Sequence, residues 1–489
     1  MSLARKALQS ALWLVLRFGG RQVANIGAFL FIAAMTPPAA FGAAAVATGL
    51  ALLLRPLVSR GFRDAVIQAE ALTPEVFDTA FWANTAWGLI LALGLALASP
   101  VAAVIFGDPT IAAMTAVGSL MVFAASVGSV FEAAIEREFR HRQLTLVQAI
   151  ASLSAVAVAA ALLWRGHGAW AAVALSVVES VALCAAVAFV ARRWPGRSVS
   201  LPELRRQLGF GGPVMISASI AGANIRLAQL IVGAFLGASA TGFFRVAAQV
   251  NQLLTQLVAG PINQVLLPAF SRVRSDHGRQ LARAVAAASA ACAPAFIGAA
   301  AVSPLLLTLL LGEEWRVAGV VSGILCFEIF AALLGPVINP ALLALGRSRQ
   351  VAAVSIVGLT VSAAMVALGA QFSLELAAVL YVGRAVFTVP LTLYFANRAL
   401  GLRPLAMLAP AAPYLVASLI MYAVVAFLVL PAAGRLDPLV AVGCGVFAGV
   451  LVYGALVRFG VSRIAPTAYE PLVTLAPGRV RKWLGPINR

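Results

Sequence analysis

The sequence predicts an all-α integral membrane protein, and three observations lead to this fold class. Of the 489 residues, 62% are apolar and 11% are charged, whereas about a quarter of an average soluble domain is charged. The mean hydropathy is +0.98, so most of the surface must face hydrocarbon rather than water. The apolar residues also form runs of about 20, the length of a membrane-spanning helix.

Fourteen such runs occur, and each is a predicted transmembrane helix. Short stretches, most of which contain glycine, proline or arginine, separate neighbouring runs. Each run can bridge the hydrocarbon core as a helix, since helices satisfy their own backbone hydrogen bonds there. The predicted spans are residues 11–35, 39–59, 80–105, 110–132, 144–164, 168–191, 211–236, 241–268, 284–311, 317–340, 350–370, 374–396, 407–431 and 438–459.

The arginines alternate between successive loops, and this alternation predicts the orientation of the chain. Loops after even-numbered spans are rich in arginine, whereas loops after odd-numbered spans carry only Arg165, Arg316 and Arg435. Cytoplasmic loops collect positive charge, so both termini are expected in the cytoplasm. The formal net charge of +18 therefore indicates membrane topology, and no nucleic acid partner is expected.

A repeated motif divides the predicted helices into two lobes. Span one contains LRFGG at 16–20, and span seven opens with LGFGG at 208–212. Small-residue turns follow each copy, AFGA at 40–43 and ATGF at 240–243. The second copy follows the first by six spans, so both run in the same direction across the membrane. We expect an N-terminal six-helix lobe over 1–200, a pseudo-symmetric six-helix lobe over 201–400, and two further helices with a basic cytoplasmic tail over 401–489.

Span one has a polar face. Arg17, Arg21 and Asn25 follow one another at intervals of four residues, which places them on one side of a helix. A charge at the centre of a span costs at least about 2.5–3.5 kcal/mol, so it should face protein or a water-filled cavity. Arg17 could instead extend to the cytoplasmic interface. Arg21 lies deeper, and we expect it in a cavity.

Further polar residues lie within later spans. In span eight, Arg245, Gln249, Gln252 and Gln256 are spaced by three or four residues and so form a polar stripe on one helix face. The amides of this stripe suit hydrogen bonds either to neighbouring helices or to sugar hydroxyls. Spans seven and twelve each add an arginine. Together with the residues of span one, the candidate substrate-binding residues are Arg226, Arg245, Gln249, Gln252, Gln256 and Arg384.

Two acids lie within spans, Glu179 in span six and Glu328 in span ten. They could neutralise buried arginines, or they could couple transport to H⁺ or Na⁺. The in-span arginines outnumber these acids. This balance favours an anionic cargo such as a diphosphate, which arginine contacts in bidentate fashion.

No catalytic constellation accompanies these charges. The sequence holds no HExxH, no CxxC and no Ser/His/Asp pattern, and its four cysteines lie apart in apolar runs. We therefore expect neither an enzyme nor a metal site nor a bound cofactor.

Several motifs are similar to those of one group of membrane transporters. They are TPPAAFG and RGFRDAVIQ between Met35 and Gln68, TAFW at 79–82, EREF at 136–139, LRRQLGFGG before span seven, and GASATGFFRVAAQ and PINQVLLPAFSRV in span eight. On these motifs most of the chain resembles the polysaccharide-transporter (oligosaccharide/O-antigen flippase) family of the multidrug/oligosaccharidyl-lipid/polysaccharide exporter superfamily. One departure is Phe244-Arg245, where a tyrosine pattern is expected.

The resemblance implies a flippase in the bacterial inner membrane. Its cargo would be an undecaprenyl-diphosphate-linked oligosaccharide, moved by alternating access for surface or extracellular polysaccharide biosynthesis. Polysaccharide polymerase and export proteins are candidate partners. The alternatives are a cation-coupled multidrug exporter, a peptidoglycan-precursor flippase, and a membrane polymerase or ligase. A polymerase or ligase would need a large external loop, which the sequence lacks.

Overall fold

The computed structural model describes residues 25–259, 277–329, 338–339, 342, 347–401, 407–435, 437–466 and 469. Among these residues all regular elements are helices. Eleven of the described helices are long and apolar enough to cross a membrane. The protein is therefore an all-α, multi-pass membrane protein.

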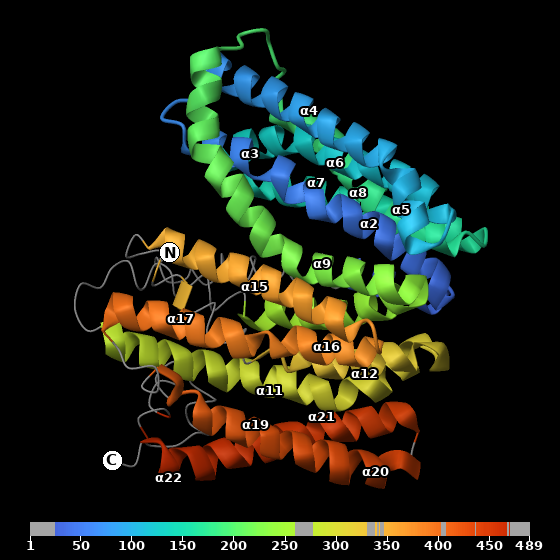
Figure 1. The fold of residues 1–489 in the computed structure, drawn as a ribbon, viewed down its shortest axis with the longest axis vertical. Helices are drawn as coiled ribbons and strands as arrows, with labels where there is room; N and C mark the ends of the chain where they lie inside the picture. The colour runs from blue at the N-terminus through green and yellow to red at the C-terminus, as the bar shows by residue number, and fades with distance from the viewer. Residues whose placement is uncertain are drawn as a thin grey trace, which may run out of the picture. The chain divides into compact units, whose positions relative to one another are not determined.

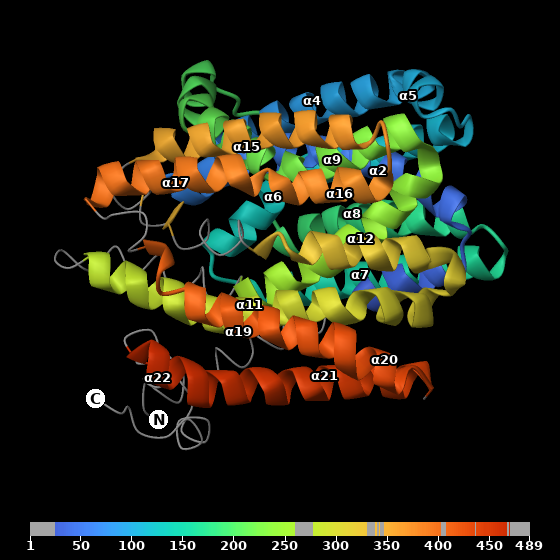
Figure 2. The same ribbon diagram turned by 60° about the horizontal axis from the view of Figure 1, so that its bottom comes forward.

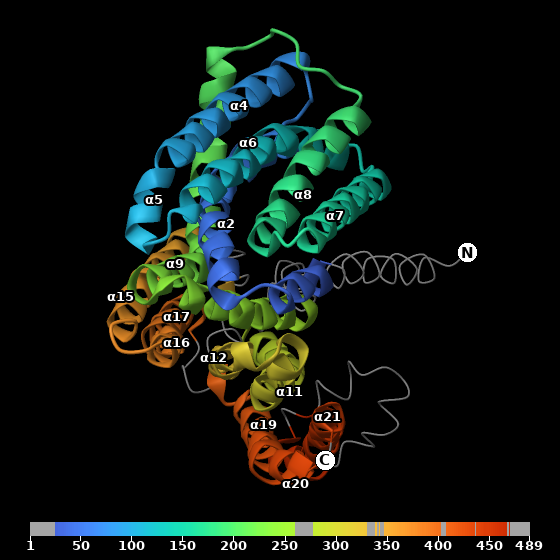
Figure 3. The same cartoon turned by 90° about the vertical axis from the view of Figure 1, so that its right-hand side faces the viewer.

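Residues 1–245 form the first compact unit. Helix α6 packs against α2, α4 and α8, while α7 and α8 form a hairpin (Figures 1 and 3). Alanine, valine and methionine side chains of α2, α6 and α8 fill the space between these helices. Its helices are Asn25–Ala34, α2 (Pro38–Ser59), α3 (Gly61–Gln68), α4 (Pro74–Leu97), α5 (Ser99–Phe106), α6 (Thr110–Arg137), α7 (His141–Trp164), α8 (Gly168–Ala191) and most of α9 (Leu201–Leu254).

Residues 246–489 form the second compact unit. Helix α11 packs against α12, α19 and α21, and α15 packs against α16 and α17 (Figure 2). Its elements are the end of α9, η1 (Thr255–Ala259), α11 (His277–Leu311), η2 (Glu313–Trp315), α12 (Arg316–Cys326), α15 (Ser348–Gly369), α16 (Leu374–Gly383), α17 (Ala385–Leu400), α19 (Ala412–Val424), η3 (Val425–Val429), α20 (Leu430–Ala432), η4 (Ala433–Arg435), α21 (Pro438–Ala455), η5 (Leu456–Val461) and α22 (Ser462–Ile464).

The helix ends follow local sequence signals. Thr73 precedes α4 and accepts a hydrogen bond from the Val76 N–H at 3.3 Å, and Pro74 occupies the first turn. Ser373 caps α16 in the same way, through the Leu376 N–H at 3.0 Å. These side chains satisfy N–H groups that the first turn of a helix leaves unpaired.

Small residues let α9 approach α2 closely in the first unit. A Cβ atom built on Gly242 would lie 2.6 Å from the Pro38 carbonyl oxygen and 3.3 Å from the Gly42 nitrogen. At the other end of the contact, a Cβ on Gly211 would lie 2.7 Å from the Gly61 carbonyl oxygen. Gly211 of the second motif copy and Gly242 of the turn that follows it thus lie against α3 and α2.

The segment between α8 and α9 is fastened to α4. The buried Asp78 carboxylate accepts hydrogen bonds from the Gly196 and Ser198 N–H groups at 2.9 and 3.1 Å. The Ser200 N–H donates to the Thr79 hydroxyl at 3.0 Å. These bonds place the connection to α9 on the first turns of α4.

Several predicted spans differ from the helices in detail. Span three breaks into α4 and α5 at Ala98, because Pro100 lacks the N–H that would continue the ladder. Spans seven and eight are joined within α9, where only Gly237, at φ 83°, is non-helical. Span twelve breaks at Arg384, between α16 and α17.

A side chain contacts the backbone at the break in span twelve. Arg384 Nη1 donates a hydrogen bond to the Tyr381 carbonyl oxygen at 2.7 Å. In an uninterrupted helix that carbonyl would accept the N–H of Ala385. The guanidinium group therefore competes with the backbone at the point where α16 ends.

Candidate functional site

Side chains from three helices meet around Asn25 in the first unit. The Asn25 Nδ2 donates a hydrogen bond to Glu179 Oε1 on α8 at 3.3 Å, and its Oδ1 accepts one from the Ser152 hydroxyl on α7. Ser152 is buried, and the other two side chains are half-buried. These bonds hold the helix Asn25–Ala34 against the α7–α8 hairpin.

Arg245 lies against the same N-terminal helix. Its guanidinium carbon is 5.5 Å from the ring centroid of Phe29, which follows Asn25 by one helical turn. A small cavity of about 30 Å³ beside these two side chains is also lined by Ser176. Ser176 precedes Glu179 by three residues, so the cavity and the Asn25 cluster lie along one side of α8.

Two arginines of α9 have unused hydrogen-bonding capacity. Within the described part of the chain, Nη1 of Arg226 and Nη1 of Arg245 are buried without a hydrogen-bond partner. Gln229, three residues after Arg226, donates from Nε2 to the Ala45 carbonyl oxygen at 2.8 Å, and Ala45 also lines the Arg245 cavity. A buried cationic donor without a hydrogen-bond partner is costly, so these guanidinium groups are suited to bind an anion.

Three glutamines continue from this point along the chain. Gln249 and Gln252 are half-buried on α9, while Gln256 is exposed in the π-helical turn η1. None of the three side chains has a hydrogen-bond partner among the residues that the structure describes. Their amide groups are thus available to a polar ligand. A π turn changes the angular spacing of a helix, and such turns are frequent at functional sites.

The second unit contains a buried ion pair at two helix breaks. Glu328 lies in the turn that follows α12, where its N–H donates to the Leu325 carbonyl oxygen at 3.0 Å. Its Oε1 accepts a hydrogen bond from Arg384 Nη2. The Arg384 guanidinium carbon also lies 3.9 Å from the Tyr381 ring centroid. Asn251 donates to the Leu325 carbonyl oxygen at 2.7 Å and so joins α9 to the same turn.

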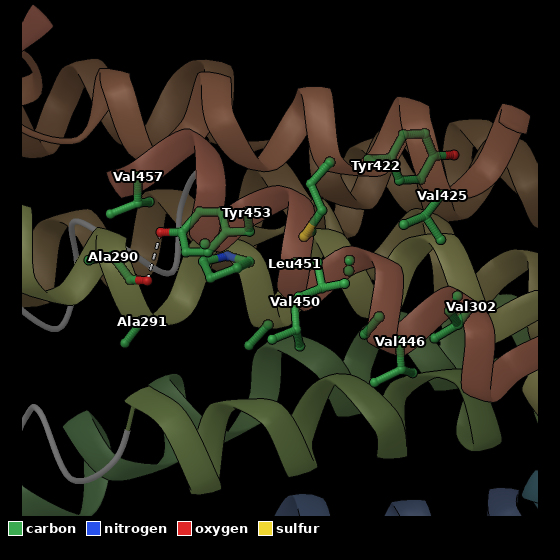
Figure 4. A pocket seen from close by; sticks show the side chains of 18 residues that line it. Ala290, Ala291, Val302, Tyr422, Val425, Val446, Val450, Leu451, Tyr453 and Val457 are labelled. Carbon is green, nitrogen blue, oxygen red and sulfur yellow. Dashed lines mark hydrogen bonds between the residues drawn. The ribbon is translucent and has the colours of Figure 1, made fainter. Parts of the chain in front are cut away.

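A larger recess in the second unit is lined almost entirely by apolar side chains. Its volume is about 820 Å³, and α11, α19, η3, α21 and η5 supply its lining (Figure 4). The lining holds no charged side chain, and the Tyr453 hydroxyl is engaged by the carbonyl oxygen of Ala290, another lining residue, to which it donates at 2.8 Å. This surface suits hydrocarbon chains rather than a polar headgroup.

The amino-acid sequence matches one known protein family over more than half of its length. The family described as "Polysaccharide biosynthesis protein" matches residues 31–319, which is more than half of the chain. The chain belongs to this polysaccharide biosynthesis protein family. The match begins within the helix Asn25–Ala34 and ends within α12.

Three curated proteins are similar to this chain. The succinoglycan biosynthesis transport protein ExoT of Rhizobium meliloti is 24% identical over 61% of each chain. The lipopolysaccharide biosynthesis protein WzxC of Escherichia coli is 24% identical over 63% of each. The teichuronic acid biosynthesis protein TuaB of Bacillus subtilis is 21% identical over 60% of this chain and 62% of TuaB. The matched region spans about three fifths of each relative. These relatives confirm the predicted resemblance to polysaccharide transporters.

Solved structures share the fold of this family member. The lipid II flippase MurJ, in an inward closed conformation, superposes with a TM-score of 0.76 at 11% identity, over 92% of this chain and 99% of MurJ. An inward-facing multidrug resistance MATE family transporter of the MOP superfamily superposes with a TM-score of 0.62 at 14% identity, over 79% of this chain and 98% of the transporter. At such identities the likeness concerns the fold.

The structure separates the predicted site residues into groups. Asn25 contacts Glu179, and Arg245 contacts Phe29, which follows Asn25 by one helical turn. In the second unit, Arg384 contacts Glu328. Arg17 and Arg21 lie outside the described residues. The binding and coupling roles of all these residues stay predictions.

Sequence reasoning overlooked four residues around the first-unit site. Ser152, Ser176 and Thr48 supply hydroxyl groups, and Phe29 supplies a ring face to Arg245. Single hydroxyl residues are common in apolar helices, where they usually bond to their own backbone. The position of Phe29 was predictable from the sequence. It follows Asn25 by four residues and therefore lies on the same helix face as Arg17, Arg21 and Asn25.

Proposed function

We propose that the protein is a flippase that moves an undecaprenyl-diphosphate-linked oligosaccharide across the bacterial inner membrane by alternating access, for surface or extracellular polysaccharide biosynthesis. It would act as a transporter and not as an enzyme. Polysaccharide polymerase and export proteins would use its product. Family membership and the similarity to the biosynthesis and transport proteins ExoT, WzxC and TuaB support this proposal.

The observation that carries the proposal is the pair of α9 arginines with buried, unpartnered Nη1 atoms. A guanidinium group placed at membrane depth is expensive and is retained where it serves a ligand or pathway. Arg226 and Arg245 would contact the diphosphate, and Gln249 and Gln252 would contact sugar hydroxyls. The isoprenoid chain would remain in hydrocarbon.

The same proposal includes a specific topology. We infer fourteen spans, both termini in the cytoplasm, lobes at 1–200 and 201–400, and two added helices over 401–489. The described helices support this inference, since α9 contains two predicted spans and the helix Asn25–Ala34 lies within span one. Cysteine accessibility at Arg165 and Arg316 positions, introduced one at a time, would report external loops if the topology is right.

Transport also needs a driving force, and the in-span acids are the candidates. Glu179 and Glu328 would take up H⁺ or Na⁺ during the cycle. Transport measured in vesicles with imposed proton or sodium gradients tests this. Dependence on neither gradient would contradict the coupling role.

The function itself is tested by deletion of the gene and analysis of lipid extracts. The lipid-linked oligosaccharide should accumulate in the deletion strain, and the wild-type gene should clear it. R226A and R245A should fail to clear it at normal protein levels, because the diphosphate loses its cationic contacts. Wild-type behaviour of both variants would contradict the cavity role of these arginines.

A matched control separates ligand binding from general loss of charge. R165A removes an exposed arginine at the end of α7, and it should support normal export. Efflux of toxic organic cations by the wild type, without any effect on the lipid-linked intermediate, would instead identify a multidrug exporter.

A further inference from the structure

The ion pair of the second unit shields a cation that the proposed cargo would need. The Arg384 side chain is 7% exposed, whereas the Glu328 side chain is 18% exposed. Glu328 therefore occupies the more open side of the pair. An approaching anion meets the carboxylate before it reaches the guanidinium group.

The hydrogen bonds of Arg384 divide its two terminal nitrogens between different partners. Nη1 donates to the Tyr381 carbonyl oxygen, which belongs to the same helix segment. Nη2 donates to Glu328, which belongs to the turn after α12. A ligand oxygen could thus replace Glu328 at Nη2 while the bond to Tyr381 continues to orient the guanidinium plane.

The place of the pair also favours a functional role. Both partners lie where spans are interrupted, Glu328 after α12 and Arg384 between α16 and α17. Interrupted helices at membrane depth commonly form substrate sites in transporters. For stability alone, a buried ion pair is seldom better than apolar residues of similar size.

We propose that Glu328 is a specificity-determining residue, which restricts Arg384 to headgroups that carry more than one negative charge. The inference rests on the proposed function. A carboxylate with one charge is displaced only by a stronger competitor, such as a diphosphate. The phosphodiester headgroups of ordinary anionic membrane lipids carry one charge and do not displace it. Glu328 thereby prevents the surrounding bilayer from occupying the cargo site.

The test measures binding of undecaprenyl diphosphate to the purified full-length protein in nanodiscs. Neutral phosphatidylcholine discs are compared with discs rich in phosphatidylglycerol. For the wild type, the apparent affinity should change little between the two lipids. For E328Q, phosphatidylglycerol should compete, and the apparent affinity should fall about tenfold, the equivalent of one charged hydrogen bond.

Two further variants address the arginine. R384K keeps the charge but loses the planar fork, and R384M loses both; each should weaken binding of undecaprenyl diphosphate in neutral discs. The double variant E328M/R384M replaces the pair by apolar side chains. It should fold, because the pair is not needed for stability, yet it should not clear the lipid-linked intermediate in cells.

The control is E136Q, which breaks the Arg63–Glu136 pair at the end of α6 and should behave as the wild type in both lipids. The inference is overturned if E328Q responds to phosphatidylglycerol no more than the wild type does, or if E328M/R384M supports normal export. Failure of the wild type both to bind undecaprenyl diphosphate and to clear the intermediate would overturn the proposed function as well.

Discussion

Replacing Gly242 with alanine should destabilise the first unit, because α2 leaves no room for a methyl group there. The new Cβ would lie 2.6 Å from the Pro38 carbonyl oxygen, whereas ordinary contacts lie at 3.4–4 Å. The obstacle is backbone and cannot rotate away. Either α9 must move from α2, or the neighbouring turn must shift.

The magnitude follows from two opposing effects. Overpacking of this kind costs about 1–3 kcal/mol. Alanine also favours a helix over glycine by about 1 kcal/mol. Gly209 provides the matched control, since it lies in the same helix, is not followed by a proline, and a Cβ there would meet nothing within 4 Å. Both variants gain the same helix propensity, so the difference between them isolates the steric effect.

The assay is thermal unfolding of the purified variants in detergent, followed by circular dichroism. A domain of this size loses roughly 2–4 °C in its unfolding midpoint per kcal/mol. G242A should therefore unfold several degrees below G209A. If G242A unfolded at the same temperature as G209A or above it, α9 could not approach α2 as closely as the structure shows.

Three other substitutions test contacts that hold the first unit together. D78A removes the acceptor for the Gly196 and Ser198 N–H groups; limited proteolysis should cleave the α8–α9 segment faster, and unchanged rates would contradict this. N84A removes the buried amide that donates to the Val58 and Ser126 carbonyl oxygens. Thermal unfolding should show a loss of about 1–3 kcal/mol in the free energy of unfolding. N84D should not restore this stability, because a carboxylate cannot donate a hydrogen bond. R137K should release the end of α3, where the Arg137 guanidinium donates to the carbonyl oxygens of four residues between Val66 and Glu70. Hydrogen exchange should rise there, whereas equal protection in R137K and the wild type would refute the role.

The helices were predictable because their signal is local. A run of about 20 apolar residues must become a helix in a bilayer, since no other conformation satisfies its backbone there. Span six was predicted at 168–191, and α8 has the same bounds, Gly168–Ala191. Predicted span three was less accurate, because α4 already begins at Pro74, among residues too polar to belong to an apolar run.

Periodicity also indicated which polar residues share a helix face, but it could not assign partners between helices. Asn25 and Glu179 are 154 residues apart, and Glu328 and Arg384 are 56 apart. Either acid could have paired with any in-span arginine on sequence grounds. Packing decided the choice, because hydrogen bonds form only where two helix faces come within reach.

Composition and residue order by themselves thus determined that the chain is a helical membrane protein, and they predicted the approximate positions of its spans and an excess of cations over anions within them. Tertiary structure decided which of the described cations is already engaged: Arg384 contacts Glu328, whereas Nη1 of Arg226 and of Arg245 is left without a partner among the described residues. The reason is physical. Transfer into a bilayer acts on each segment separately, while the pairing of two charges depends on contacts between segments far apart in the chain.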